Sequence, residues 1–384
     1  MKIVHIAPGS IYNEGWGYQE NLLTKYQAKM GHDVTLIVPN QMFEKGQPVN
    51  CDECDYISND GFRVIRIKYK RILSKRITST CSLLPVYKLL NEIEPDLIHF
   101  HCLISLTLNQ VSKYVKKHKK CKLIIDNHLD YNIGYKPKNS FKDWIIVRFY
   151  RFIYSLNKKQ VTRVYGVTPW RKKYAEEIFG VSPSITDVLI MGADDEAISF
   201  SNRKSIRKEI RKKYNIDDDT FLIVTGGKID QKKNIHLLAD AIRNIKKVKL
   251  MIFGNCLSSF EKTFENSLND KCIYIGWIDA NKVYDYFFAA DLVAFPGQHS
   301  VLWEQACASK TPCFFKMFEG MNHINNGGTS VIVDFKTSEE LAAHLEKMIF
   351  TDYYYRVKSI SESEKTDIYL YSNIAKKSLE TIVK

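Results

Sequence analysis

The stretch from Phe295 to Cys313 reads FPGQHSVLWEQACASKTPC. The apolar run 292–295 predicts a strand, the proline-glycine pair after it predicts a turn, and a helix is expected to begin near Val301. A helix start after a strand presents free backbone N–H groups and a positive dipole end, which suit an anion such as phosphate. Glu304, one turn into this helix, is placed to accept a hydrogen bond from a hydroxyl, for instance that of a ribose.

The chain length and the order of its patterns predict two domains of the α/β class. With 384 residues the chain is long enough for two domains of ordinary size. Strand and helix patterns alternate without an antiparallel block, which is typical of doubly wound, Rossmann-like domains. We place the first domain at 1–196 and the second at 197–370. A final helix, 371–384, is expected to cross back onto the first domain.

The individual elements follow from apolar periodicity and from helix and turn signals. Strands are expected at 2–7, 33–38, 61–69, 96–100, 122–126, 164–168, 188–190, 221–225, 249–253, 273–275, 292–295 and 330–333. Helices are expected at 18–30, 82–93, 104–118, 141–159, 169–179, 235–245, 281–289, 338–349 and 371–383. Residues 40–60 are expected to form a loop. The cation-rich span 196–215 is expected to be a solvated helix that leads into the second domain.

The formal net charge of +13 has two interpretations that stay open. It reflects general solubility, or it attracts an anionic partner such as a phosphorylated small molecule, anionic lipid or nucleic acid. Nucleic-acid binding predicts a continuous basic stripe with exposed aromatic side chains, whereas these cations lie in separate helices and loops. We therefore expect no nucleic acid. The basic stretch 68–76 and the aromatic and basic helix 141–159 fit an anionic membrane surface, although the helix also fits an ordinary cover of the sheet.

The cysteine pattern argues against disulfides and against a metal site. The nine cysteines include one close pair, Cys51 and Cys54, and no second pair completes a zinc pattern. We therefore expect no metal, and a reducing cytoplasm fits this cysteine usage best. The first residues predict a strand rather than a signal peptide, and no apolar run is long enough to span a bilayer.

Glycine-bearing loops follow the first strand of each predicted domain. Gly15 and Gly17 let a ligand approach the backbone closely, or they simply allow a tight turn. In the second domain, Lys228 and Lys233 follow Gly227 across a short turn. Two ammonium groups before a helix suit a diphosphate, although a solvated basic loop would have the same pattern.

Three histidines lie in or just after predicted strands. His99 alternates within a strand, which favours a packed core residue. His101 comes just past the end of that strand and fits either a core or a functional role. His128 follows a separate strand, with Asn127 and Asp130 close by. Ligands collect at the carboxyl ends of parallel strands, so position alone leaves both a structural and a chemical role open for His128.

Five short motifs occur in the order typical of one enzyme family. They are Ile190–Asp194 (IMGAD), Gly227–Asn234 (GKIDQKKN), Tyr274–Trp277 (YIGW), Ala289–Leu292 (AADL) and Trp303–Ala308 (WEQACA). In this order they resemble the motifs of the retaining glycosyltransferases of the GT-B fold, glycosyltransferase family 4, over nearly the whole chain. The resemblance implies two Rossmann-like domains that face each other across a cleft, the first binding the acceptor and the second the donor.

The resemblance also implies a role for each matching residue. Lys228 and Lys233 hold the nucleotide diphosphate and neutralise the leaving group. Glu304 binds the ribose hydroxyls, and His128 contacts the donor sugar at the reaction centre. The other donor-binding positions implied are Gly15, Gly17, Gly227, Gly254, Trp277, Ile278, Gln298, His299, Ser300, Val301 and Leu302. The nucleotide diphosphate sugar is a co-substrate, a UDP-sugar is favoured, and no metal or other cofactor is implied.

Two positions depart from the family pattern. The first glutamate of the family's paired motif falls at Pro296, so Gln298 or His299 is expected to replace its contact with the sugar hydroxyls. The family's arginine is Lys228, which keeps the charge but loses the planar bidentate geometry. A different donor sugar is one consequence. A catalytically impaired nucleotide-sugar-binding protein, or a GT-B epimerase or phosphorylase, stays an alternative.

The activity implied is a metal-independent sugar transfer of the hexosyltransferase type, with the anomeric configuration retained. The acceptor is expected to be a hydroxyl of a glycan or lipid-linked molecule in the assembly of capsule, O-antigen or lipopolysaccharide. A cytoplasmic protein at the inner face of the cell membrane is the expected setting, and the sequence predicts no particular oligomeric state.

Overall fold

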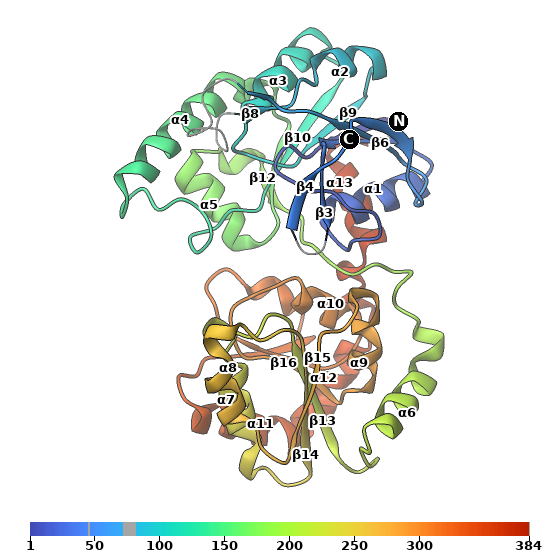
Figure 1. Cartoon of the computed structure of the whole chain (residues 1–384), viewed down its shortest axis with the longest axis vertical. Coiled ribbons are helices and arrows are strands. Elements are labelled where there is room, and N and C mark those ends of the chain that lie inside the picture. The colour runs from blue at the N-terminus through green and yellow to red at the C-terminus, as the bar shows by residue number, and fades with distance from the viewer. Residues whose placement is uncertain (45–46, 72–81, 384) are drawn as a thin grey trace. The chain divides into compact units, whose positions relative to one another are not determined.

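The chain folds into two compact units, and both have the predicted α/β class. The computed structural model describes residues 1–44, 47–71 and 82–383 (Figure 1). Unit 1 consists of Met1–Ile190 together with Ile374–Lys384, and unit 2 consists of Met191–Asn373. The predicted boundaries at 196/197 and 370/371 fall close to these divisions.

Unit 1 is built on an eight-stranded sheet whose pairings are parallel except for the one at the β5 edge. In spatial order the strands are β12 (Thr186–Val188), β11 (Arg163–Gly166), β10 (Lys122–Asn127), β9 (Leu97–Phe100), β1 (Lys2–Ile6), β2 (Asp33–Pro39), β6 (Arg63–Ile67) and β5 (Cys54–Ile57). The helices are α1 (Gln19–Lys29), α2 (Tyr87–Ile93), α3 (Thr107–Lys117), α4 (Phe141–Asn157), α5 (Pro169–Phe179) and α13 (Tyr371–Val383).

The period of two along the central strands sends alternate side chains to the two faces of the unit 1 sheet, and both faces are buried. Val4 and Ile6 of β1 are fully buried in one apolar core with Leu108 of α3 and Tyr154 of α4. The residue between them, His5, is also fully buried, but it meets polar side chains of α1. This polar contact therefore lies within the protein rather than in solvent.

The prediction of a loop at 40–60, and of no antiparallel pairing, was wrong. This region contains β3 (Gln41–Glu44), β4 (Gln47–Asn50) and β5, and the first two pair as an antiparallel hairpin. The side chains of these strands are mostly exposed or half-buried, so they carry no apolar alternation by which a strand is recognised. A second short hairpin joins β7 (Lys70–Arg71) to β8 (Ser82–Leu83).

Other differences concern helix boundaries. The helix predicted over 82–93 begins only at Tyr87, because Pro85 disfavours helical backbone in the residue before it. Of the predicted basic stretch 68–76, residues 72–76 lie outside the described residues. Within the part of the chain that is described, no helix combines the length and apolar character needed to cross a bilayer.

Unit 2 is built on a six-stranded parallel sheet, as predicted for a doubly wound domain. In spatial order the strands are β15 (Cys272–Gly276), β14 (Val248–Phe253), β13 (Phe221–Gly226), β16 (Leu292–Phe295), β17 (Cys313–Lys316) and β18 (Ser330–Val333). The helices are α6 (Arg203–Lys213), α7 (Ile235–Ala241), α8 (Glu261–Ser267), α9 (Val283–Ala289), α10 (Leu302–Ala308), α11 (Ser338–Ile349) and α12 (Asp352–Ser361). The sequence analysis did not predict β17, α8 or α12.

The prediction that the cations of α6 form a solvated face was wrong for three arginines. Arg203, Arg207 and Arg211 recur every four residues, so they share one face of the helix. Arg207 and Arg211 both bind Asp291, at 2.7 and 3.3 Å, and all three donate to backbone carbonyls of neighbouring segments. These contacts fasten α6 to the rest of unit 2.

Candidate functional site

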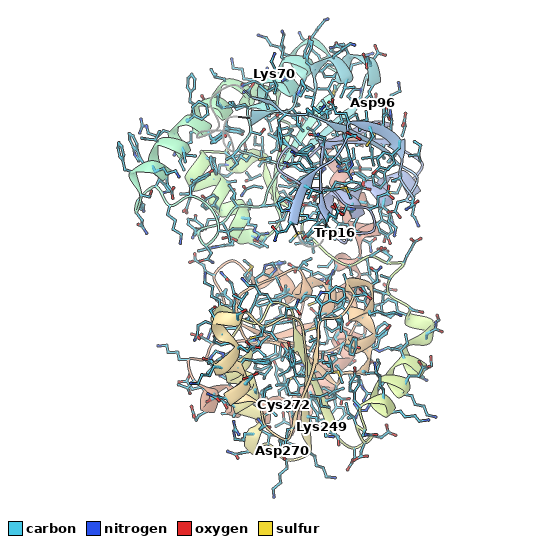
Figure 2. All side chains as sticks on the ribbon, viewed as in Figure 1. Trp16, Lys70, Asp96, Lys249, Asp270 and Cys272 are labelled. Atoms are coloured by element: carbon cyan, nitrogen blue, oxygen red, sulfur yellow. The ribbon has the colours of Figure 1, made fainter. Side chains whose placement is uncertain are left out.

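A cavity of about 500 Å³ opens at the carboxyl edge of the unit 2 sheet. The predicted donor-binding residues on its wall are Gly227, Lys228, Gly254, Trp277, Ile278 and Leu302. They follow β13, β14, β15 and β16, and carboxyl ends of parallel strands meet at one edge. Lys249 and Cys272, at the other ends of β14 and β15, mark the opposite edge of this sheet (Figure 2). Four separate predicted segments are thus brought together.

Two positions on the cavity surface accept only glycine. A Cβ on Gly254 would lie 1.8 Å from the backbone oxygen of Gly227, and the φ angle of Gly254 is +114°. Gly227 has a φ angle of +102°, and a Cβ there would lie 2.9 Å from Leu302 Cδ1. Both backbone conformations favour glycine, and the absence of side chains leaves the cavity floor open to a ligand.

The cavity combines an aromatic surface with an exposed positive charge. Trp277 is 63% exposed, so its ring is available for stacking. Lys228 is 59% exposed at the side chain and lies 3.5 Å from Asp230 Oδ2. Asp230 also caps the short turn Gln231–Lys233 by accepting from two backbone N–H groups. The carboxylate therefore orders the loop that carries Lys228.

Lys233 holds the loop before α10 rather than projecting freely. Its Nζ donates to the backbone oxygens of Gln298 and His299, at 2.5 and 3.2 Å. Burial, together with the nearby charge of Lys228, lowers the pKa of Lys233 to about 8, despite the opposing effect of Asp230. A phosphate that approached this ammonium group would find it charged at neutral pH and partly neutral above pH 8.

Glu304 lies one turn into α10, as predicted, but its carboxylate is fully buried between two histidines. His299 Nε2 donates to it at 2.8 Å, and His323 Nε2 donates to the same oxygen at 2.7 Å. Burial alone would favour the neutral acid. His299 and His323 outweigh it and lower the pKa of Glu304 to about 2. The contact of His323 was not predicted, since no motif in the sequence links it to Glu304.

The rest of the predicted loop has structural contacts of its own. The backbone N–H of Gln298 donates to the oxygen of Lys232 at 2.9 Å, the Ser300 oxygen accepts from Trp303, and Val301 is the residue before the first turn of α10. Leu302 is the member of this stretch on the cavity wall, and Gln305 of the same helix joins it there. Contacts of Gln298 and His299 with a sugar stay a prediction.

The remaining predicted residues belong to unit 1. Gly15 lies in the loop between β1 and α1 with a φ angle of +74°, and Gly17 lies in the same loop. His128 directly follows β10, and its Nε2 is 3.4 Å from Asp126 Oδ1. The His128 side chain is 38% exposed, whereas Asp126 is fully buried. His99 is a fully buried core residue, as expected, and His101 is buried beside it.

Three groups in the described part of the chain bring metal-ligand atoms within 4.8 Å of one another. The groups are His5, His99 and His101; His101, Asp126 and His128; and His299, Glu304 and His323. In each group at least one hydrogen bond joins two members: His5 with His101, His101 with Asp126, and His323 with Glu304.

Comparisons with known proteins identify both halves of the chain. Residues 21–197 match the sequence profile described as Glycosyltransferase Family 4, and residues 206–365 match the one described as Glycosyl transferases group 1.

Curated relatives and a solved structure agree with these profiles. The chain is 25% identical to the processive diacylglycerol alpha-glucosyltransferase of Acholeplasma laidlawii over 56% of this chain. The match spans 64% of the length of that relative, which is slightly less than two thirds. It is 23% identical, over 89% of this chain and 87% of the relative, to TuaC of Bacillus subtilis (strain 168), whose name assigns it to teichuronic acid biosynthesis. The crystal structure of Anabaena HepE in complex with UDP shares the fold over the full length of both chains, with a TM-score of 0.71 and 15% identity. The chain therefore belongs to the glycosyltransferases of the GT-B type, with a family 4 domain in its first half and a group 1 domain in its second.

Proposed function

We propose that this glycosyltransferase takes a sugar from a UDP-sugar and transfers it, with retention of the anomeric configuration, to a hydroxyl of a glycan or lipid-linked acceptor. The observation that carries the proposal is the unit 2 cavity, where a stacking surface, an ammonium group and two glycines meet. A base would stack on Trp277, and the diphosphate would lie against Gly227 and Lys228. The volume of about 500 Å³ is in the range of small-molecule sites.

Lys228 and Lys233 would also stabilise the leaving group. Negative charge develops on the diphosphate as the bond to the sugar breaks, and Lys228 with Lys233 would neutralise it. With two ammonium groups in place, we expect turnover without an added divalent cation. In the retaining step proposed here, a departing phosphate oxygen takes the proton of the acceptor hydroxyl on the same face of the sugar. The new glycosidic bond then forms on the face that the diphosphate leaves.

A lipid-linked acceptor is supported by the surface of α4. This helix exposes a stripe of large apolar side chains: Phe141, Trp144, Ile145, Phe149, Phe152 and Leu156. The Arg148 guanidinium lies 4.8 Å from the centre of the Trp144 ring, and a neighbouring cavity of about 450 Å³ is lined by Lys138, Arg148 and Arg151. Aromatic and basic side chains together suit the interface of an anionic membrane. We propose that α4 places the enzyme at the cytoplasmic face of the membrane.

The setting proposed is the assembly of a cell-surface polysaccharide such as capsule, O-antigen or lipopolysaccharide. The names of the relatives support a glycolipid or wall-polymer acceptor, since one acts on diacylglycerol and the other is assigned to teichuronic acid biosynthesis.

A thermal-shift screen against UDP, GDP, ADP and dTDP, each with and without a sugar, tests the donor. A ligand that binds only the folded state adds about 2.7 kcal/mol at 100 times its Kd. We expect UDP and one UDP-sugar to give the largest shift. A larger shift with another nucleotide would contradict the choice of donor.

A product assay with the donor found in the screen tests the reaction itself. We expect transfer only when an acceptor hydroxyl is present, and a product whose anomeric NMR coupling matches that of the donor. Inversion would overturn the retaining mechanism, and consumption of inorganic phosphate would favour a phosphorylase. Donor binding without turnover on any acceptor would favour the catalytically impaired alternative. Activity lost with EDTA and restored by a divalent cation would overturn metal independence.

A further inference from the structure

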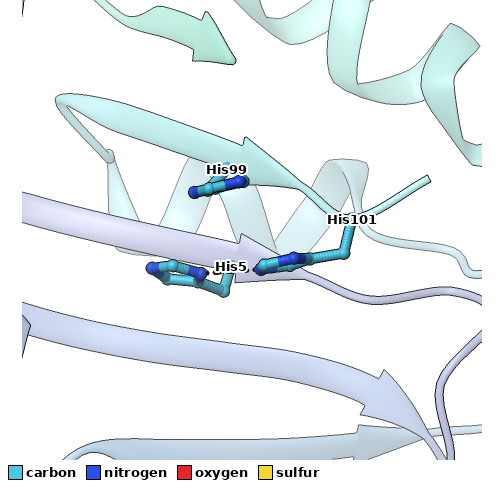
Figure 3. Close-up of side chains that lie close together, drawn as sticks. All are labelled: His5, His99 and His101. Carbon is cyan, nitrogen blue, oxygen red and sulfur yellow. Dashed lines mark hydrogen bonds between the residues drawn. The ribbon is translucent and has the colours of Figure 1, made fainter. Parts of the chain in front are cut away.

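One face of the unit 1 sheet carries a buried row of titratable side chains that the proposed reaction does not explain. His5 comes from β1, His99 and His101 from β9 and the residue after it, and Asp126 from β10. Figure 3 shows the three imidazole rings close together, with His5 and His101 joined edge to edge and His99 lying over them. His101 is 6% exposed, and the other three are fully buried.

Hydrogen bonds extend this row to the C-terminal helix. Ser378 Oγ donates to the backbone oxygen of Ala375 at 2.6 Å, so the same hydroxyl accepts from Gln27 Nε2 at 3.0 Å. The other end of the Gln27 amide is an acceptor, and His5 Nε2 donates to it at 2.6 Å. Since a neutral imidazole has one donor and one acceptor nitrogen, His5 Nδ1 must accept. His101 Nε2 donates to it at 2.8 Å.

The other nitrogen of His101 fixes its charge. His101 Nδ1 lies 2.6 Å from Asp126 Oδ2, and the same oxygen accepts from His99 Nε2 at 3.2 Å. With the Asp126 carboxylate ionised, Oδ2 can only accept, so His101 Nδ1 must donate to it. His101 therefore donates from both nitrogens, as an imidazolium paired with the Asp126 carboxylate.

The electrostatics of the surroundings agree with this assignment. Burial works against both charges, yet Asp126 raises the pKa of His101, and His101 with His128 holds the pKa of Asp126 well below its usual range. Glu20 of α1 also favours the cation. Burial and the neighbouring charge of His101 lower the pKa of His99 to about 4, so that ring stays neutral at pH 7. Burial, together with the neighbouring imidazoles of His99 and His101, also lowers the pKa of His5.

We propose that the His101–Asp126 ion pair is a positioning device that holds His128 with its proton on Nε2. Asp126 Oδ1 is buried without a hydrogen-bond partner among the described residues, and it lies 3.4 Å from His128 Nε2. His128 is also the half-exposed member of the group. With the proton on Nε2, its Nδ1 is free to accept a hydrogen bond from a substrate hydroxyl. The substrate contact rests on the proposed function, whereas the charge of His101 and the tautomer of His128 do not.

The test begins with the free protein. Long-range ¹H–¹⁵N NMR of the full-length chain labelled in its histidines reports the protonation of each ring nitrogen. At about pH 7 we expect both nitrogens of His101 to be protonated and the proton of His128 to sit on Nε2. A neutral His101, or a His128 proton on Nδ1, overturns the proposal, even if sugar transfer is confirmed.

Variants then separate positioning from structural support. In Asp126→Asn we expect His101 to lose its second proton, His128 to lose its single tautomer, and kcat to fall about tenfold or more with the donor KM nearly unchanged. His118→Gln removes a histidine of unit 1 that stacks on Tyr114 outside this row, and it should leave kcat, KM and the His128 spectrum unchanged. An unchanged His128 tautomer in Asp126→Asn overturns the positioning role.

A second variant guards against misfolding of the first. If Asp126→Asn does not fold, His101→Gln removes the cation. Burial without this cation favours the protonated carboxyl of Asp126, so the variant should give the same loss of the His128 tautomer and of kcat. A His101→Gln enzyme with normal kcat and a normal His128 spectrum overturns the proposal. If the wild-type protein transfers sugar from no donor, the proposed function fails while the NMR result still decides the ion pair.

Discussion

Lys228 and Lys232 carry the same charge four positions apart but have different surroundings. Lys228 lines the unit 2 cavity near Asp230, whereas Lys232 is exposed on the short turn that follows. Of the two, only Lys228 is therefore placed to stabilise charge on the diphosphate, whereas both lysines contribute to the long-range attraction of an anion. Variants of Lys228 and Lys232 therefore distinguish leaving-group stabilisation from nonspecific attraction by a basic loop.

We predict that Lys228→Ala lowers kcat/KM by about 100-fold, as expected for loss of one group that stabilises developing charge. Lys232→Ala should change it by less than about twofold, because solvent screens an exposed charge. Steady-state kinetics with a saturating acceptor measures both. Equal losses in the two variants would contradict the role of Lys228.

The pKa of Lys233, about 8, makes donor binding sensitive to alkaline pH. Below pH 8 the ammonium is charged with or without a ligand, so the affinity for the diphosphate should not change with pH. Above pH 8 the free protein loses this proton while the diphosphate complex keeps it, so affinity should fall up to about tenfold per pH unit. Calorimetric titration of UDP between about pH 7 and about pH 9.5 measures this fall. Lys233→Arg keeps its charge and should abolish it, and a level wild-type profile would count against Lys233 as a phosphate ligand.

For single residues, the sequence predicts which positions line the cavity better than it predicts the hydrogen-bond partners of the site residues. Gly227 and Trp277 belong to motifs that the sequence shows, Gly254 directly follows a predicted strand, and the sheet brings these positions together. Glu304 was predicted as a hydroxyl-binding group, but its two histidine partners depend on tertiary packing. His323 lies nineteen positions further along the chain, and no local pattern indicates that it folds back onto α10.

At the scale of elements, α6 shows why a charge count misleads. Its cations look like a solvated face because lysine and arginine both count as positive. The difference lies in the fork of the guanidinium group, which can satisfy several carbonyl oxygens at once. Arg211 is 2% exposed and donates to the backbone oxygens of Asp217 and Thr220 as well as to Asp291. Arginines spaced by four residues were the signal available in the sequence.

We predict that Arg211→Ala destabilises unit 2 by about 3 kcal/mol, because it leaves the carbonyls of Asp217 and Thr220 without this donor and removes one of the two arginines that bind Asp291. Lys212→Ala, on the exposed side of the same helix, should cost less than about 0.5 kcal/mol. Urea unfolding followed by tryptophan fluorescence compares the two variants. Similar midpoints would show that the α6 contacts contribute little.

At the scale of the whole molecule, the net charge of +13 and the α4 stripe act over different ranges. Charge attracts the protein to an anionic surface and is screened by salt, whereas apolar side chains act only on contact. Binding that uses both should need anionic lipid and weaken at high salt. Binding through charge alone would be indifferent to the apolar stripe.

We predict that Phe152→Glu with Leu156→Glu lowers co-sedimentation with anionic vesicles at least about tenfold, since two apolar contacts are lost. Both side chains are well exposed, at 58% and 60%, so the fold should tolerate the change. Phe350→Glu, at the end of α11, is a matched control with 61% exposure and should bind like the wild type. Equal binding of all variants would exclude α4 as the contact surface.

The return of α13 to unit 1 has a consequence for synthesis on the ribosome. Gln27 and Ser378 are hydrogen-bonded although 351 positions separate them, and unit 2 is an insertion between the two parts of unit 1. Translation therefore completes the second unit while the first still lacks its last helix. Loss of α13 would therefore remove contacts from unit 1 while leaving the sheet of unit 2 intact.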